Sequence, residues 1–123
     1  MINIFNLRTS LFAYLIFGLT FSCQGQDCKE LNSDFSTYES ALKEIKSADF
    51  RLLDNCNTSK SSWILGAEFR SCDKQYGFLL LSTKKRTYIH TNVPIELWNE
   101  FKKADSFGKF YNSRIKGKYK LII

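Results

Sequence analysis

Histidine and proline are almost absent from this chain, which has one of each among its 123 residues, His90 and Pro94. A lone histidine excludes a metal site built from several histidines. The few glycines and the single proline, without any repeating period, exclude collagen-like, repeat and coiled-coil architectures. The longest apolar run covers residues 11–21, and it is too short for a membrane-spanning helix, which needs roughly 20 residues.

Apolar and aromatic residues are plentiful, at 44% and 15% of the chain, and phenylalanine alone occurs 11 times. The formal net charge is +6, which is not extreme for this length. This composition predicts a folded chain rather than a disordered one, and the length suits a single domain.

The N-terminal segment has the features of an export signal. Arg8 precedes the apolar run, and the run leads to Ser22 and Cys23. A small residue before a cysteine at this point resembles a bacterial lipoprotein box, in the loose form of Bacteroidetes-type lipoproteins. We therefore expect residues 1–22 to be a signal peptide, Cys23 to be lipidated, and residues 23–33 to tether the protein to a bacterial envelope membrane, at the periplasm or cell surface. The alternatives are ordinary signal-peptidase cleavage near residues 25–26, or an apolar helix of a cytosolic protein.

Three cysteines remain after either cleavage, and outside the cytoplasm they allow one disulfide and one free thiol. We favour Cys28–Cys72, because this bond would staple the N-terminal segment onto the later sheet; Cys56–Cys72 stays open as the alternative. There is no Cys-x-x-Cys spacing, so neither a dithiol redox motif nor a zinc clamp is indicated.

Hydrophobic periodicity divides the rest of the chain into helices and strands. It predicts an amphipathic helix from Ser36 to about Ala48 with a capping box at its start, a short strand near residues 50–53 and a polar loop over 54–61. Strands follow at 63–70, 76–81 and 87–91, then a helix from Pro94 and a short helix capped by Ser106. The alternation in the tail indicates either a last strand or an extended packed segment. The predicted fold is α+β: a small antiparallel β-meander of three to four strands, packed with an N-terminal helix and two C-terminal helices, in one domain over 34–123.

An ordered set of short motifs runs through the second half of the chain. The set comprises Ser61-Ser62-x-Ile64, Thr87-Tyr88-x-His90, Asn92-Val93-Pro94, Leu97-Trp98-x-x-Phe101, Ala104-Asp105-Ser106-Phe107-Gly108, Phe110-Tyr111-Asn112-x-x-Ile115 and Tyr119. Taken together it resembles the KTSC domain, named for the C-terminus of some lysyl-tRNA synthetases, over residues 60–120. The family's central Tyr-x-Tyr reads Tyr88-Ile89-His90 here, which puts a stacking role at position 90 in doubt.

No constellation of residues indicates catalysis. His90 has no evident nucleophile or orienting partner in the sequence, and Glu96 and Glu100, four apart on one helix, are typical of a solvated face. We therefore expect no enzyme activity, no metal and no cofactor.

From Lys84 onward the chain carries ten basic and three acidic residues, a net +7. The resulting candidate ligand surface comprises Tyr88, His90, Lys109, Tyr111, Arg114, Lys116, Lys118 and Lys120. The first hypothesis is a non-enzymatic, exported binding module with an unknown protein, lipid or glycan partner at a membrane surface. The second, suggested by the synthetase resemblance, is a module that binds nucleic acid such as RNA by phosphate contacts and stacking, although export disfavours RNA as a natural ligand.

Overall fold

Five antiparallel strands, neighbouring one another in chain order, form the sheet. The structure is a computed structural model that describes residues 25–31 and 34–123, so the expected signal peptide and Cys23 lie outside the described residues. The strands are β1 (Leu52–Cys56), β2 (Gly66–Ser71), β3 (Tyr76–Ser82), β4 (Thr87–Pro94) and β5 (Leu121–Ile122). The predicted α+β fold is confirmed, with five strands in the meander.

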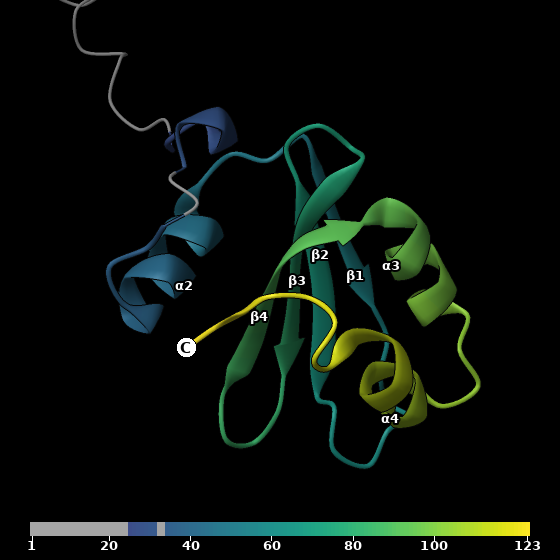
Figure 1. Ribbon diagram of the computed structural model, residues 1–123. Helices are drawn as coiled ribbons and strands as arrows, with labels where there is room; N and C mark the ends of the chain where they lie inside the picture. The colour runs from purple at the N-terminus through teal and green to yellow at the C-terminus, as the bar shows by residue number, and fades with distance from the viewer. Residues whose placement is uncertain (1–24, 32–33) are drawn as a thin grey trace, which may run out of the picture.

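Helices cover both faces of this sheet. In Figure 1, α2 lies on one side of the strands, and α3 and α4 lie on the other. The helical elements are η1 (Cys28–Glu30), α2 (Tyr38–Ser47), α3 (Ile95–Lys102), α4 (Phe107–Phe110) and the π-helical η2 (Tyr111–Ile115). Within the described ranges, none of these helices has the length and apolar character to cross a membrane.

The central strand β3 is apolar on both faces and contributes to two separate hydrophobic clusters. Leu79 and Leu81 face α3, α4 and η2, where the larger cluster includes Phe69, Trp98 and Phe101. On the opposite face, a smaller cluster joins Leu80 and Ile89 to Ala41 and Ile45 of α2. The three leucines are at most 1% exposed, so both helical layers depend on this strand.

Several predicted boundaries were wrong by a few residues, and β1 shows why. The strand continues through residues 54–56, which we expected to be a polar loop. The Asp54 carboxylate accepts hydrogen bonds from Trp98 Nε1 at 2.8 Å and Lys102 Nζ at 2.7 Å. These long-range partners from α3 satisfy a polar strand residue that local propensity disfavours.

Three other element starts also differ from the sequence prediction. The N-cap of α2 is Thr37 rather than Ser36, and its hydroxyl accepts from the backbone N–H of Ser40. Pro94 ends β4 instead of opening the following helix, which begins at the next residue. The second strand starts at Gly66 and not at 63, because a turn around Ser61 precedes it.

The N-terminal segment is fastened to the sheet by the predicted disulfide. Cys28 is bonded to Cys72, with their Cα atoms 5.8 Å apart, while Cys56 is a free thiol. Cys28 is 6% exposed, and its backbone N–H donates to the carbonyl of Asp49 at 3.1 Å. The described part of the expected tether, residues 25–31, therefore packs on the domain instead of hanging free.

Helix α2 is also held at its C-terminal end by a half-buried arginine from the sheet. The Arg70 guanidinium donates to the carbonyls of Ile45 and Lys46 at 3.2 and 3.3 Å, and it pairs with Glu68 at 3.3 Å. A cation at this end satisfies carbonyls that lack intrahelical partners and complements the helix dipole.

We expect the disulfide to stabilise the fold, because it closes a loop with a sequence separation of 44 residues. In the chain-entropy model a loop of this length contributes about 4 kcal/mol. The double variant Cys28→Ser/Cys72→Ser should therefore unfold at a clearly lower urea concentration than the parent protein. Cys56→Ser is the matched control and should unfold close to the parent. Equal midpoints for the double variant and the parent would show that the bond contributes nothing.

Candidate functional site

A pocket of about 390 Å³ opens beside the hairpin that joins β3 to β4. Two aromatic side chains, two lysines and two hydroxyl side chains line it: Trp63, Tyr88, Lys84, Lys85, Ser62 and Thr83. The volume falls within the range of roughly 300–1,000 Å³ that is usual for small-molecule sites. We call this site the hairpin pocket.

The basic wall of the hairpin pocket is ordered by one hydroxyl group. Thr83 Oγ1 accepts from the backbone N–H groups of Lys85 and Arg86, both at 3.3 Å, and donates to the carbonyl of Arg86 at 3.0 Å. These bonds close the turn between the two strands. Lys84 and Lys85 therefore extend from a defined backbone at the rim of the pocket.

The aromatic wall is formed by Trp63, which remains 37% exposed. The Ser61 hydroxyl accepts from the backbone N–H of Ile64 at 3.1 Å, which fixes the turn that presents the indole. The indole lies against the backbone of Gly108, where an added Cβ would come within 2.6 Å of Trp63 Nε1. Glycine at position 108 therefore makes room for this ring.

Beneath Trp63 lies a buried chain of polar contacts. The Tyr111 ring meets the indole edge-to-face, with centroids 5.8 Å apart, and its hydroxyl lies 2.9 Å from His90 Nε2. His90 Nδ1 lies 3.2 Å from the carbonyl of Tyr119. Because a carbonyl can only accept, Nδ1 carries the proton of the neutral ring and Nε2 accepts from the Tyr111 hydroxyl. The two bonds thus fix both the tautomer and the ring orientation.

Burial sets the ionisation of this pair. Removal from water disfavours the charged imidazolium and lowers the pKa of His90, against an opposing effect of the Tyr119 carbonyl. Burial likewise raises the pKa of the Tyr111 hydroxyl. Both groups are therefore neutral at pH 7, and they support the pocket rather than carry charge into it.

The structure separates the basic and aromatic residues that we expected to form one surface. Tyr88 lines the hairpin pocket, but His90 and Tyr111 are 1% and 5% exposed and belong to the core. Lys109, Lys116 and Lys118 are exposed. Arg114 is also exposed and pairs with Glu100, and its guanidinium lies 5.1 Å from the Phe110 ring centroid.

Lys120, the last residue of that set, lines a different pocket on the α2 side of the sheet. Conversely, sequence reasoning missed Trp63, Lys84 and Lys85 as pocket residues. The sequence did carry a signal for these pocket residues, because Trp63 lies inside the Ser61-Ser62-x-Ile64 motif and the two lysines occupy a predicted turn.

Comparison with known proteins supports the resemblance found in the motifs. Residues 80–119 match the family model of the KTSC domain, a segment that runs from β3 through β4, α3, α4 and η2. The crystal structure of a KTSC domain protein from Yersinia pestis is similar to this chain, with 28% sequence identity and a TM-score of 0.50. The match covers 99% of that protein and 58% of this chain. No curated protein matches the chain.

We predict a pH dependence of stability that arises from His90, the only histidine. Its folded-state pKa is lowered, so the unfolded chain takes up the proton more readily. The free energy of unfolding should therefore be level above the ordinary pKa of 6.5 and should fall as the pH drops below it. Urea titrations between about pH 7.5 and 5 measure this, above the range where carboxylates dominate.

The variant His90→Gln cannot titrate, and it should lose this pH dependence whatever its absolute stability. Tyr111→Phe keeps the buried imidazole and should retain the dependence. A parent protein whose unfolding free energy is level from pH 7.5 to 5 would contradict the assignment.

Proposed function

We propose that this protein is a non-enzymatic binding module, exported and held at an envelope membrane by a lipid on Cys23. The observation that carries the binding role is the hairpin pocket, in which two aromatic rings stand beside two lysines. An exposed tryptophan supported from below by Gly108 and Tyr111 is a rigid, preorganised surface for a flat ligand.

The same pocket defines the chemistry of its ligand. Lys84 and Lys85 favour negative charge, and Trp63 and Tyr88 favour a planar ring stacked between or upon them. The ligand class is therefore an anion that bears an aromatic or similarly flat group. A protein, lipid or glycan partner would therefore be selected by whether it presents both a negative charge and a flat ring.

The described polar groups support a binding role over catalysis. His90 uses both ring nitrogens inside the core, so neither is free to act as a general base toward a substrate. Burial raises the pKa of the Cys56 thiol, which disfavours the thiolate that a nucleophile would need.

Export is supported by the Cys28–Cys72 disulfide, because such bonds persist mainly outside the reducing cytoplasm. Cys23 lies only five residues before this bond, so a lipid there would place the folded domain close to the bilayer surface.

Nucleic-acid binding is a second candidate, in keeping with the resemblance to a domain of some lysyl-tRNA synthetases. The specific observation that favours it is the same pairing of stacking rings with lysines, since single strands are bound by stacking and phosphate neutralisation. Arg86, which follows the two lysines and lies 4.0 Å from the Tyr38 ring centroid, would offer a further cation to a single-stranded ligand.

We expect the hairpin pocket to bind adenosine monophosphate more tightly than adenosine, which lacks the charge, or ribose 5-phosphate, which lacks the ring. Trp63 fluorescence reports binding, because the other tryptophan, Trp98, is buried. The variant Lys84→Met/Lys85→Met should weaken binding by about tenfold or more, because the loss of even one charged contact has about that effect. Lys43→Met, an exposed lysine of α2, is the control and should leave the affinity unchanged.

Single-stranded oligonucleotides distinguish the second candidate. A strand that binds much more tightly than the mononucleotide, with an affinity that falls steeply as salt rises, would favour nucleic acid. Equal affinities for adenosine and its monophosphate, or an equal loss in Lys43→Met, would contradict the proposed pocket.

The anchor is tested separately by the intact mass of the protein isolated from a bacterial host. We expect a chain that begins at an acylated Cys23 in the membrane fraction, and a Cys23→Ser variant that loses the acyl mass and leaves that fraction. An unprocessed chain beginning at Met1 in the cytosol would contradict export.

A further inference from the structure

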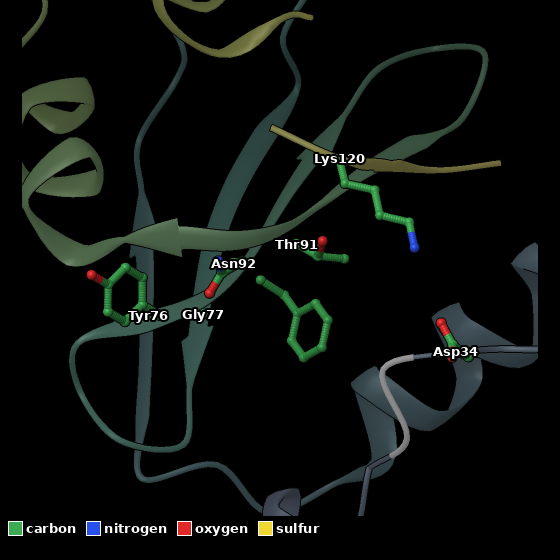
Figure 2. Close-up of a pocket in the computed structure, with 7 residues that line it drawn as sticks. Asp34, Tyr76, Gly77, Thr91, Asn92 and Lys120 are labelled. Atoms are coloured by element: carbon green, nitrogen blue, oxygen red, sulfur yellow. The ribbon is translucent and has the colours of Figure 1, made fainter. Parts of the chain in front are cut away.

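A second pocket of about 390 Å³ lies on the α2 side of the sheet, at the end of the β3–β4 pair opposite the hairpin. Figure 2 shows its lining, which comes from the segment before α2, the start of β3, the end of β4 and the segment before β5. The labelled residues are Asp34, Tyr76, Gly77, Thr91, Asn92 and Lys120, and Phe78 completes the lining.

The pocket coincides with an irregularity in the sheet. Gly77 pairs with Val93 and Leu79 with His90, so Phe78 alone faces Thr91 and Asn92 in a β-bulge. Asn92 has a φ of 55°, in the left-handed region that few residues other than glycine adopt. Bulges and such backbone conformations gather beside binding sites, where they redirect side chains.

Gly77 is required by the same local geometry. A Cβ at this position would collide with the carbonyl oxygen of Arg70 and crowd the Phe69 ring. Gly77 also lines the pocket, so its backbone forms part of the wall there.

The floor of the pocket is apolar. The Phe78 ring packs against Phe35, with centroids 6.3 Å apart, and edge-on against Phe50 at 6.0 Å. These rings belong to the cluster under α2, so the floor is fixed by the core. An apolar group seated on Phe78 would extend that cluster.

The rim carries one charge of each sign. Figure 2 shows Lys120 reaching toward the pocket from the C-terminal segment, with Asp34 across from it on the segment that leads to α2. Among residues 25–31 and 34–123, neither side chain forms an ion pair. Figure 2 shows Tyr76 and Asn92, which supply neutral polar groups, on the other side of the pocket from these two charges.

We propose that this pocket binds an apolar amino acid as its zwitterion. Lys120 would receive the carboxylate, Asp34 the ammonium, and the Phe78 ring the apolar side chain. A simple anion would be repelled by Asp34 and a simple cation by Lys120, whereas a zwitterion satisfies both. This site is separate from the hairpin pocket, and a test of one site does not decide the other.

The test is a titration of the full protein with L-phenylalanine, followed by the backbone amide signals in nuclear magnetic resonance. We expect the amides of Gly77 and Asn92 to shift with saturation, while the indole N–H of Trp63 stays in place. N-acetyl-L-phenylalanine and L-phenylalaninamide each lack one charge, and each should bind about tenfold more weakly.

The variants Lys120→Met and Asp34→Asn should each weaken L-phenylalanine binding by a similar factor. Both side chains are exposed, so neither change is expected to disturb the fold. Lys118→Met removes a lysine of the same segment outside the pocket, and it should bind like the parent.

The proposal is overturned if L-phenylalanine causes no shifts at millimolar concentration or shifts only the Trp63 indole. It is equally overturned if the acetylated or amidated compound binds as well as the zwitterion, or if Lys118→Met weakens binding as much as Lys120→Met.

Discussion

Burial of β3 on both faces is the constraint on which the rest of the structure depends. A strand with three consecutive leucines at 1% exposure or less needs a cover on each side of the sheet. The cover formed by α3, α4 and η2 follows directly along the chain and brings most of the large aromatic rings. The other cover, α2, is smaller, and two further interactions hold it in place. Arg70 donates hydrogen bonds to the carbonyls at its C-terminal end, and the Cys28–Cys72 disulfide lies nearby.

The same arrangement explains why the basic residues of the C-terminal half do not form one binding face. Successive side chains of β4 point to opposite faces of the sheet, and Tyr88 lies on the face opposite α2. The chain then returns to the sheet at β5, which places Lys120 beside the α2 layer. His90 and Tyr111 lie between them as a neutral hydrogen-bonded pair inside the core. The Tyr111 ring of this pair packs against Trp63 at one wall of the hairpin pocket. The two pockets, at opposite ends of the β3–β4 pair, are lined by different chemical groups.

The order of helices and strands could be read from the sequence because hydrophobic period and local caps are short-range signals. The hydroxyl of Ser106, which caps α4 as predicted, is an example. The last three residues of β1 and the buried state of His90 could not be read from the sequence, because both depend on partners far along the chain. These partners are Trp98 and Lys102 for Asp54, and Tyr111 for His90. The hairpin pocket joins segments twenty residues apart, which is why only Tyr88 of its lining was anticipated.

The Cys28–Cys72 bond also determines how the domain would carry a mechanical load. Tension applied before residue 28 and at the C-terminus would pass through the two sulfur atoms into the turn between β2 and β3. The 43 residues between the two cysteines, including α2 and β1, would lie outside the covalent path and bear no pull. A pull on the C-terminus would first load β5, which pairs with β4 at only two positions, and then the longer pairing of β4 with β3. The bond would thus keep α2 from being peeled away before the strands that follow residue 72 separate.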